Sequence, residues 1–321
     1  MRAVRITAPG TVRLTEIPRP QPTRDEVAVR VRWAAVCGTD RKLARNGAAV
    51  HRVPGHEVAG ELTDGTPVAV HPDVGCGACP LCATGWPNRC PRRQSVGIDR
   101  DGGFAEWMVV PPRQVLAVEG LPLDLAALLE PLACCVHAVD LLQPDRLRTA
   151  AVVGAGAMGV LAMWTLQARG VRVVVSQRSA QRRELAGKLG ADAVIAPDDD
   201  VDRAAGAPLD AVIVTAPGSG PLRWALEHVA VGGIVHAFAG TPGGADVDVN
   251  AVHYRHLRLV GSTGSTPRDL QVALDLARGG RIDLDRLPRT TVGLADLPHV
   301  LTGEPDRRHL RTLVDVGGSP S

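Results

Sequence analysis

Four cysteines in one short segment are the residues whose spacing has the clearest chemical meaning. The segment reads Cys76-Gly-Ala-Cys79-Pro-Leu-Cys82, and Cys90 follows shortly after it. Thiolates at this spacing can converge on one ion, which is typical of a structural zinc site with four cysteine ligands. Disulfide pairing, or simple burial of small thiols, is the alternative interpretation. A structural ion fixes a loop but performs no reaction, so the reaction has to be inferred from other residues.

A glycine-rich turn in the middle of the chain indicates a second kind of chemistry. Residues 150–153 predict a buried strand, and Gly154-Ala-Gly156-Ala-Met158-Gly159 lead from it into an apolar run typical of a helix. Gly154 permits a tight turn, Gly156 lets the backbone approach a pyrophosphate, and Gly159 lets the helix pack against the strand. Amides at the helix N-terminus, including the region of Met158, would then face the phosphates. The turn therefore predicts a dinucleotide site.

The tip of the next predicted strand bears on the choice between NAD and NADP. The chain continues Ser176-Gln177-Arg178-Ser179, and no Asp or Glu is available there to bind the ribose hydroxyls of NAD. Arg178, flanked by the hydroxyls of Ser176 and Ser179, could instead hold the 2′-phosphate of NADP. An ordinary exposed arginine is the alternative. We expect NADP at this site, with NAD not excluded.

The elements that must position these residues alternate in type along the chain. Segments 209–215 and 234–238 predict two more buried strands, and 221–230 between them has helical spacing. Short apolar strands that alternate with amphipathic helices are typical of an open, parallel, doubly wound sheet. The predicted fold class is therefore α/β.

Composition limits the number of domains, the compartment and the partners. With 321 residues, 45% of them hydrophobic and 22% charged, the chain can bury two cores. Seven cysteines, an odd number, and no signal-type apolar start favour a reducing compartment, and no apolar run is long enough to span a membrane. We expect a cytoplasmic protein. A net charge of +2 and few aromatic residues argue against nucleic acid as a partner.

Together these motifs resemble the zinc-dependent medium-chain alcohol dehydrogenase family, and the resemblance covers essentially the whole chain. Within the family, Glu57 after His56 and the later stretch 253–270 are similar to the polyol and sugar branch, which includes sorbitol and threonine dehydrogenases. Besides the cysteines and the glycine turn, the resemblance rests on Cys37-Gly-Thr-Asp40, Gly55-His56-Glu57, Gly102-Gly-Phe-Ala-Glu106 and Glu130-Pro-Leu-Ala133.

The resemblance implies a domain organisation. A mostly β, GroES-like catalytic domain with the zinc lobe would occupy residues 1–138, and a Rossmann domain would occupy 139–260. Residues 261–321 would then return to complete the catalytic domain. Family members are commonly dimers or tetramers, so the resemblance also implies a homo-oligomer, and the sequence does not choose between the two sizes.

The resemblance also implies a second, catalytic zinc ion. Cys37, His56 and a carboxylate would hold this ion, and the sequence does not decide whether the carboxylate is Glu57 or Glu130. Zinc lowers the pKa of a bound water to about 7 and should act similarly on an alcohol, which does not ionise near neutral pH in water. Taken alone, each of these residues has a structural explanation, such as a buried thiol or a core histidine. Their joint match to the family pattern favours the metal site.

A proton has to leave the substrate oxygen, and Thr39, shortly after Cys37, is the candidate for its route. The hydroxyl of Thr39 can donate and accept, and it stands two residues past a predicted ligand. Family members often carry a histidine as the next member of the relay, and this chain has Lys42 in that place. Lys42 could contact a polar substrate, bind a cofactor phosphate or simply face water.

The implied function is hydride transfer between NAD(P) and a secondary alcohol or ketone. One tyrosine and two phenylalanines in the whole chain argue against an aromatic-walled pocket, so a polyol, sugar, cyclitol or aminocyclitol fits better than a bulky apolar alcohol. Two alternatives stay open. The first is a zinc-free quinone or enone reductase of the same superfamily, and the second is a nucleotide-binding protein without turnover.

Overall fold

The computed structural model describes residues 1–47, 50–305 and 308–318. The chain divides into two compact units, one formed by residues 1–133 with 264–321 and the other by residues 134–263. The first of these is called the first unit and the other the second unit below. Each has its own hydrophobic core.

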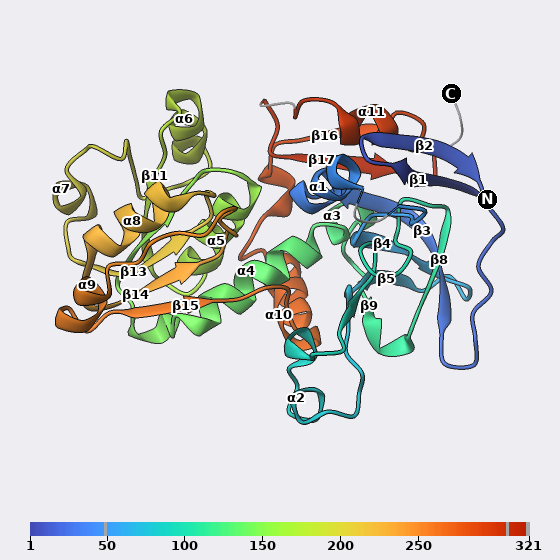
Figure 1. The fold of residues 1–321 in the computed structure, drawn as a ribbon, viewed down its shortest axis with the longest axis horizontal. Helices are drawn as coiled ribbons and strands as arrows, with labels where there is room; N and C mark the ends of the chain where they lie inside the picture. Colours follow the sequence, from blue (N-terminus) through green and yellow to red (C-terminus); the bar gives the residue numbers. More distant parts are fainter. Residues whose placement is uncertain (48–49, 306–307, 319–321) are drawn as a thin grey trace. The chain divides into compact units, whose positions relative to one another are not determined.

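The second unit is built on one parallel sheet whose strands run β12-β11-β10-β13-β14-β15 (Figure 1). The order reverses between β10 and β13, so this point lies between the two halves of a doubly wound sheet, where such folds bind ligands at the carboxyl ends of the strands. This confirms the predicted α/β class. The strands are β10 (Thr149–Val153), β11 (Arg172–Ser176), β12 (Ala193–Ile195), β13 (Leu209–Val214), β14 (Val229–Ala237) and β15 (Arg258–Gly261).

Helices pack against this sheet, and its central strands β10 and β13 are mostly buried and apolar rather than alternating, whereas the edge strand β15 is largely exposed. All five residues of β10 are buried. The helix predicted over 221–230 is α8, and the strand predicted at 234–238 begins earlier, at Val229. The helices are α5 (Ala157–Gln167), α6 (Ala180–Lys188), α7 (Val201–Ala205), α8 (Ser219–His228) and α9 (Val249–Tyr254).

The first unit is mostly β and contains a sheet with the order β16-β17-β3-β4-β5-β9, with β8 also paired to β3. Strand β17 pairs antiparallel with β3, so the C-terminal part of the chain completes a sheet begun by the N-terminal part. A separate hairpin joins β1 (Arg2–Ala8) and β2 (Thr11–Glu16). The strands of the sheet are β3 (Val27–Val36), β4 (Glu57–Leu62), β5 (Pro67–Val70), β8 (Trp107–Val110), β9 (Val115–Ala117), β16 (Arg289–Gly293) and β17 (Arg311–Asp315).

Two helices next to this sheet bear on the site. Helix α1 begins directly after β3, and α4 contains the point at which the chain passes from the first unit to the second. These two helices carry several of the predicted site residues. The helices are α1 (Gly38–Asn46), α3 (Leu123–Ala126), α4 (Leu129–Leu141), α10 (Pro267–Arg278) and α11 (Leu297–Thr302).

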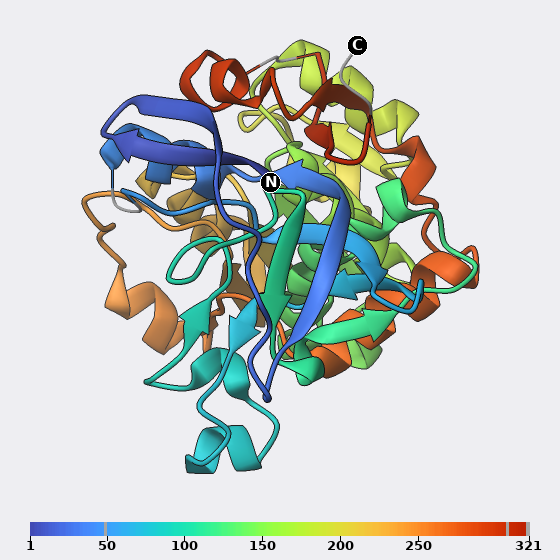
Figure 2. The same cartoon turned by 90° about the vertical axis from the view of Figure 1, so that its right-hand side faces the viewer.

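The cysteine segment forms a lobe that projects from the strands of the first unit, as two views at right angles show (Figures 1 and 2). It has almost no regular structure beyond the short helix α2 (Pro80–Ala83), one 3-10 turn (Pro87–Arg89) and a strand pair, β6 (Asp73–Val74) with β7 (Gln94–Ser95). A loop with so little core of its own needs another source of stability, which a bound ion would supply.

The described part of the chain contains no helix with the length and apolar character that a bilayer crossing requires.

Candidate active site

Three of the predicted ligands converge in the first unit. The ligand atoms of Cys37, His56 and Glu57 all lie within 4.8 Å of one another. Cys37 stands between the end of β3 and the start of α1, and Glu57 opens β4. Because β3 and β4 pair antiparallel with Ala35 opposite Glu57, the end of one strand is brought beside the beginning of the other. The sheet register therefore assembles the set.

Asp40 fixes the position of two members of this set. It is fully buried in the first turn of α1, where its carboxylate accepts hydrogen bonds from the amides of Cys37 at 2.8 Å and Gly55 at 3.2 Å. Its Oδ1 also lies 3.4 Å from Nδ1 of His56. A carboxylate beside one ring nitrogen orients a histidine and raises the basicity of the other nitrogen toward a metal. Asp40 is therefore well placed to hold His56 for metal binding.

Arg311 forms a buried ion pair with Glu57. Its Nη2 lies 2.8 Å from Oε1 of Glu57, and both side chains are almost completely buried. The other oxygen of Glu57, Oε2, is buried and has no hydrogen-bond partner among the described residues. An unpaired buried acceptor costs about 1–3 kcal/mol, so this oxygen fits a bound cation. The set offers one sulfur, one nitrogen and one oxygen, a combination that zinc accepts.

The pKa shifts of Cys37 and Glu57 also fit a bound cation. Burial alone would raise the pKa of Cys37, but the charges of His56 and Arg311 lower it to about 6. Burial raises the pKa of Glu57 well above its usual value, with Cys37 adding to the effect and Arg311 opposing it. The thiol of Cys37 is thus held close to ionisation, whereas burial favours the protonated form of Glu57. A bound cation would favour the ionised form of both groups and displace their protons.

Glu130, the other candidate carboxylate, lies near the same groups. It is 8% exposed in the first turn of α4. Its charge contributes to raising the pKa values of both Glu57 and Arg311, so it is close enough to act on them. The converged set contains Glu57, and the choice of the third protein ligand stays a prediction.

Thr39, the candidate for the proton route, and Lys42 both lie on α1. Thr39 is half-buried in the first turn of the helix, close in sequence to Cys37 and Asp40, whereas Lys42 is exposed on the next turn. The exposure of Lys42 agrees with a side chain that faces water, although it does not assign a role. Both roles stay predictions.

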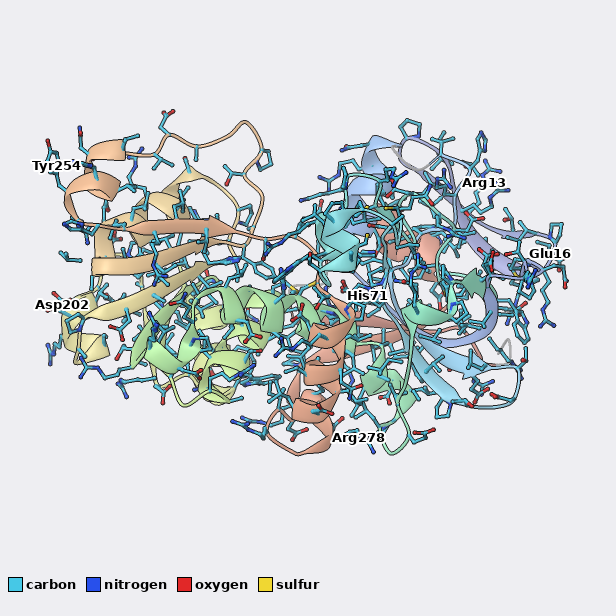
Figure 3. The ribbon with its side chains drawn as sticks, turned by 90° about the horizontal axis from the view of Figure 1, so that it is seen from below. Arg13, Glu16, His71, Asp202, Tyr254 and Arg278 are labelled. Atoms are coloured by element: carbon cyan, nitrogen blue, oxygen red, sulfur yellow. The ribbon has the colours of Figure 1, made fainter. Side chains whose placement is uncertain are left out.

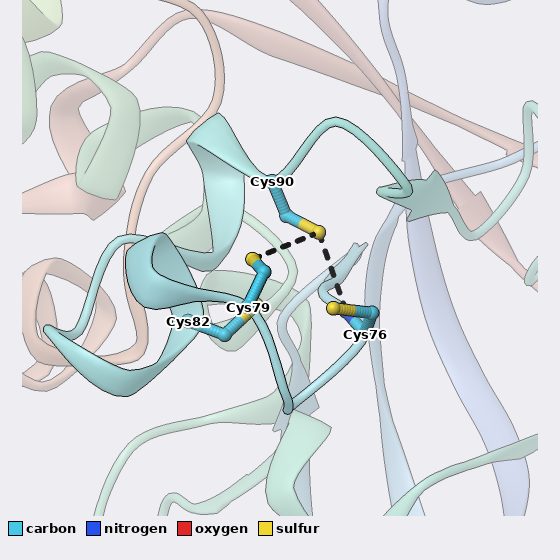
Figure 4. Close-up of side chains that lie close together, drawn as sticks. All are labelled: Cys76, Cys79, Cys82 and Cys90. Atoms are coloured by element: carbon cyan, nitrogen blue, oxygen red, sulfur yellow. Dashed lines mark hydrogen bonds between the residues drawn. The ribbon is translucent and has the colours of Figure 1, made fainter.

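The four cysteines of the lobe also converge. The sulfur atoms of Cys76, Cys79, Cys82 and Cys90 all lie within 4.8 Å of one another (Figure 4). They are free thiols, so the disulfide alternative is not adopted. The backbone amide of Ala78 lowers the pKa of Cys76 to about 6, with a further contribution from the amide of Cys79. Four thiols at this separation fit a tetrahedral zinc ion.

The three glycines of the turn have different structural roles. Gly154 has a φ of +109°, which favours glycine, and a Cβ on Gly159 would lie only 1.9 Å from the carbonyl oxygen of Gly154. These two residues are therefore required by the turn itself. A Cβ on Gly156 would meet no protein atom within 4 Å, and Gly156 is exposed at the N-cap of α5. The space in front of Gly156 is open to a ligand.

A cavity of about 620 Å³ lies in the second unit at the carboxyl ends of β10, β11 and β13. The hydroxyl of Ser176 is buried without a hydrogen-bond partner among the described residues. Met158, also predicted to contact the cofactor, is half-buried in the first turn of α5, where its carbonyl accepts from the thiol of Cys135 at 3.5 Å. The cavity is lined by Val153, Gly154, Ser176, Gln177, Arg178, Pro197, Trp224 and residues 216–221.

Sequence reasoning missed two residues of the site. Arg311 lies far along the chain from Glu57 and has no motif of its own, so no local signal could have found it. Asp40 belongs to a motif but has no predicted role in the site, yet its position three residues after Cys37 is the spacing at which a side chain caps the amide that opens a helix. That spacing was the available signal for Asp40.

Comparison with known proteins identifies dehydrogenase families and relatives that match most of the chain. Residues 23–120 match the family model "Alcohol dehydrogenase GroES-like domain", and residues 157–278 match "Zinc-binding dehydrogenase". An L-threonine 3-dehydrogenase of Pyrococcus horikoshii is 31% identical over 89% of both chains. An L-galactonate-5-dehydrogenase of Escherichia coli K12 is 30% identical over 84% of both.

A solved structure is similar throughout. A protein of Sinorhizobium meliloti 1021, described as a zinc-binding dehydrogenase and bound to NADP, superposes with a TM-score of 0.91. It is 30% identical in sequence, and the match covers 98% of this chain and 99% of the other.

Proposed function

The chain belongs to the zinc-dependent medium-chain alcohol dehydrogenase family, and from this premise we propose that it interconverts a secondary alcohol and a ketone with NAD(P) as cofactor. The observation that carries the proposal is the convergence of Cys37, His56 and Glu57 in one buried set. The open space in front of Gly156 supports the cofactor half of the proposal.

Oxidation of the alcohol removes a proton from its oxygen and a hydride from the adjacent carbon. Cys37 and His56, with Glu57 or Glu130, would hold the zinc ion. When bound, this ion would supply polarisation of the substrate oxygen, and NAD(P) would supply the hydride acceptor. Asp40 keeps the ring of His56 in position.

The remaining chemistry is proton movement and charge control by the chain's own groups. Thr39 takes the proton from the substrate oxygen through its hydroxyl and passes it outward, because a hydroxyl can accept one proton while donating another. Arg311 binds one oxygen of Glu57 and leaves the other oxygen available. Lys42 stands on the exposed face of α1, where its side chain, which has donors only, is a candidate to contact a polar substrate or a cofactor phosphate.

The substrate proposed is a polyol, sugar or cyclitol. Relatives named for threonine and galactonate oxidation act on small polar molecules with a secondary hydroxyl, which supports this class. The scarcity of aromatic residues supports it as well, since an apolar alcohol would need an apolar wall.

The cofactor proposed is NADP, with NAD as the second candidate. Gln177 and Arg178 stand at the carboxyl end of β11 and line the cavity, and no acid accompanies them there to repel a 2′-phosphate. The similar structure that holds NADP supports this preference.

We assign the catalytic role to residues 1–138 with 261–321 and cofactor binding to 139–260.

The assembly proposed is a homodimer, and two such dimers could form a tetramer. Strand β15 ends the sheet of the second unit, and an edge strand can pair with a second copy through its backbone groups. Leu259 on this strand is 39% exposed. On the neighbouring helix α9, Tyr254 is 74% exposed and points outward (Figure 3).

A panel assay tests the reaction. Polyols, cyclitols and simple alcohols are offered with NAD and with NADP in parallel, and reduction of the cofactor is followed by absorbance. We expect turnover of a polyhydroxylated secondary alcohol, faster with NADP. Reduction of quinones or enones, by a protein that holds one zinc ion per chain in the cysteine lobe, would instead favour the reductase alternative, which has no catalytic zinc.

A further inference from the structure

The base of the cysteine lobe contacts the point at which the chain returns from the second unit to the first. The chain enters the lobe through β6 and leaves it through β7, and these strands pair with Asp73 opposite Ser95. The boundary between the units falls directly before Gly264, and α10 begins at Pro267. Residues 264–266 are called the return segment below. All of the contacts that follow lie within the first unit.

Asp73 is the centre of this contact. Its side chain is buried, and Oδ1 accepts hydrogen bonds from Nη1 of Arg93 at 3.0 Å and from Oγ of Ser95 at 2.8 Å. The other oxygen, Oδ2, faces Gly264 so closely that a Cβ on Gly264 would lie only 2.0 Å from it. The φ of Gly264 is +65°, which also favours glycine. The carboxylate that joins the two ends of the lobe therefore also packs against the return segment.

A second contact involves the ring of His71, two residues before Asp73. Nε2 of His71 lies 3.1 Å from the carbonyl oxygen of Ser265 and 3.2 Å from its hydroxyl oxygen (Figure 3). Ser265 offers an acceptor and a hydroxyl that can donate, so the contact is satisfied in either tautomer of the ring. Nε2 of Gln114 donates to the carbonyl oxygens of His71 and Asp73. The backbone that enters the lobe is thus held beside the return segment.

The return segment in turn begins α10. Thr266 is the N-cap of this helix, and its hydroxyl accepts from the amide of Asp269 at 3.2 Å. Oδ2 of Asp269 accepts from the amide of Thr266 at 2.8 Å, and both side chains are buried. This reciprocal pair fixes the first turn of the helix. Exchange of these amides with solvent therefore reports on the order of the return segment.

The order of the lobe depends on the ion that its four cysteines would hold, because the lobe has little core of its own. Asp73 stands three residues before Cys76, and Arg93 stands three residues after Cys90. The ion and the ion pair of Asp73 with Arg93 thus close the same loop, one at its tip and the other at its base. Loss of the ion removes the constraint that keeps the base closed.

We propose that metal binding in the cysteine lobe controls the order of the return segment and of the first turn of α10, through Asp73 and His71. The lobe is then a conformational device, because loss of its zinc loosens the connection by which the chain returns to the first unit. This inference needs only the four-cysteine zinc site. It does not depend on the proposed reaction or on its cofactor.

Hydrogen–deuterium exchange of the zinc-loaded, full-length protein tests the coupling, with peptides read by mass spectrometry. Cys79→Ala removes one ligand of the lobe and should speed amide exchange in residues 264–270 by roughly tenfold or more, as the loss of local protection would. Cys37→Ala removes a ligand of the other set and should leave this exchange unchanged. The hairpin of β1 and β2 lies on the opposite side of the first unit from the lobe (Figures 1 and 2), and its exchange should not change in either variant.

A second variant opens the base of the lobe while all four cysteines stay in place. Arg93→Met removes the guanidinium that binds Asp73 and should speed exchange in residues 264–270 by roughly three- to tenfold, with the zinc content unchanged. Arg89→Met is the matched control. Arg89 is an exposed arginine of the same lobe whose guanidinium lies over the ring of Trp86, so its loss should leave residues 264–270 unchanged.

Unaltered exchange of residues 264–270 in Cys79→Ala would overturn the coupling. An equal increase in the hairpin of β1 and β2 would overturn it as well, since it would show a general loss of stability. If Cys79→Ala did not fold, the other pair of variants would decide, and equal exchange in Arg93→Met and Arg89→Met would contradict the proposal. Failure of the proposed function is a separate result, because absence of turnover with every alcohol would leave these exchange rates as they are.

Discussion

At the scale of single residues, the ion pair between Arg311 and Glu57 carries the largest energetic consequence. Removing one partner of a buried ion pair leaves the other charge without compensation, at a cost of about 3–5 kcal/mol. We therefore expect Arg311→Met to lower the free energy of unfolding by about that amount in urea denaturation. Adding Glu57→Gln to this variant should recover part of the loss, because the uncompensated carboxylate is then gone.

An exposed ion pair provides the matched control. Lys188 and Glu184 pair on the surface of α6 with both side chains mostly exposed. Lys188→Met should change the free energy of unfolding by less than about 1 kcal/mol. If Arg311→Met were as well tolerated as Lys188→Met, the buried pair would not be the support of Glu57 that its geometry indicates.

His71 makes the stability of the first unit depend on pH. Its ring is buried between Gln114 and Ser265, with Nε2 3.1 Å from the carbonyl oxygen of Ser265. Burial lowers the pKa of His71, against the opposing charge of Asp73. A histidine pKa that is lower in the folded state means that the unfolded chain binds more protons. The contribution of His71 to the free energy of unfolding is therefore fully present above the unfolded pKa of about 6.5. It decreases as the pH drops below this value.

The test compares the free energy of unfolding of two variants at pH 8 and at pH 5. His71→Gln should show a smaller decrease between these pH values than the unmodified protein. His253→Gln, at an exposed position, should show the same decrease as the unmodified protein. A His71→Gln variant that lost as much stability at pH 5 as the unmodified protein would exclude this histidine as a source of the effect.

At the scale of elements, two glycines of the turn serve different purposes, since Gly159 is needed for folding and Gly156 for cofactor binding. Gly156 has an ordinary extended backbone with φ of −84° and open space where a Cβ would stand, so Gly156→Ala should fold with normal stability. The added methyl would occupy the approach of the pyrophosphate, and NADPH affinity should fall by roughly tenfold or more, about 1.4 kcal/mol. Calorimetry and thermal denaturation of the same sample measure both effects.

Gly159→Ala is the contrasting variant in that turn. Its Cβ would meet the carbonyl oxygen of Gly154, so overpacking should destabilise the second unit by about 1–3 kcal/mol even without cofactor. Equal losses of stability in Gly156→Ala and Gly159→Ala would contradict the assignment of Gly159 to packing and of Gly156 to ligand access.

The elements that the sequence predicted well are those whose signals are local. The glycine turn, the strands around it and the cysteine lobe each depend on residues within one short stretch, because turn geometry and metal-ligand spacing are set over a few residues. Arg311 could not be predicted in this way. It reaches Glu57 only because β17 pairs with β3, which in turn pairs with β4, and such long-range pairing leaves no local pattern.

At the scale of the whole molecule, the edge of the sheet at β15 bears on assembly. A lysine in place of Leu259 would put a charge on the proposed interface, so Leu259→Lys should shift the protein from dimer toward monomer in analytical ultracentrifugation. Leu81→Lys is the matched control, since Leu81 is exposed to a similar degree in the cysteine lobe. A dimer that persisted in Leu259→Lys but dissociated in Leu81→Lys would place the interface elsewhere.

The number of zinc ions per chain tests the central claim most directly. Elemental analysis of the zinc-loaded protein and of Cys37→Ala compares the two metal sets, because the substitution removes one ligand of the buried set and leaves the four cysteines of the lobe intact. We predict two zinc ions in the unmodified chain and one in Cys37→Ala. One zinc ion in both proteins would contradict a metal held by Cys37, His56 and a carboxylate.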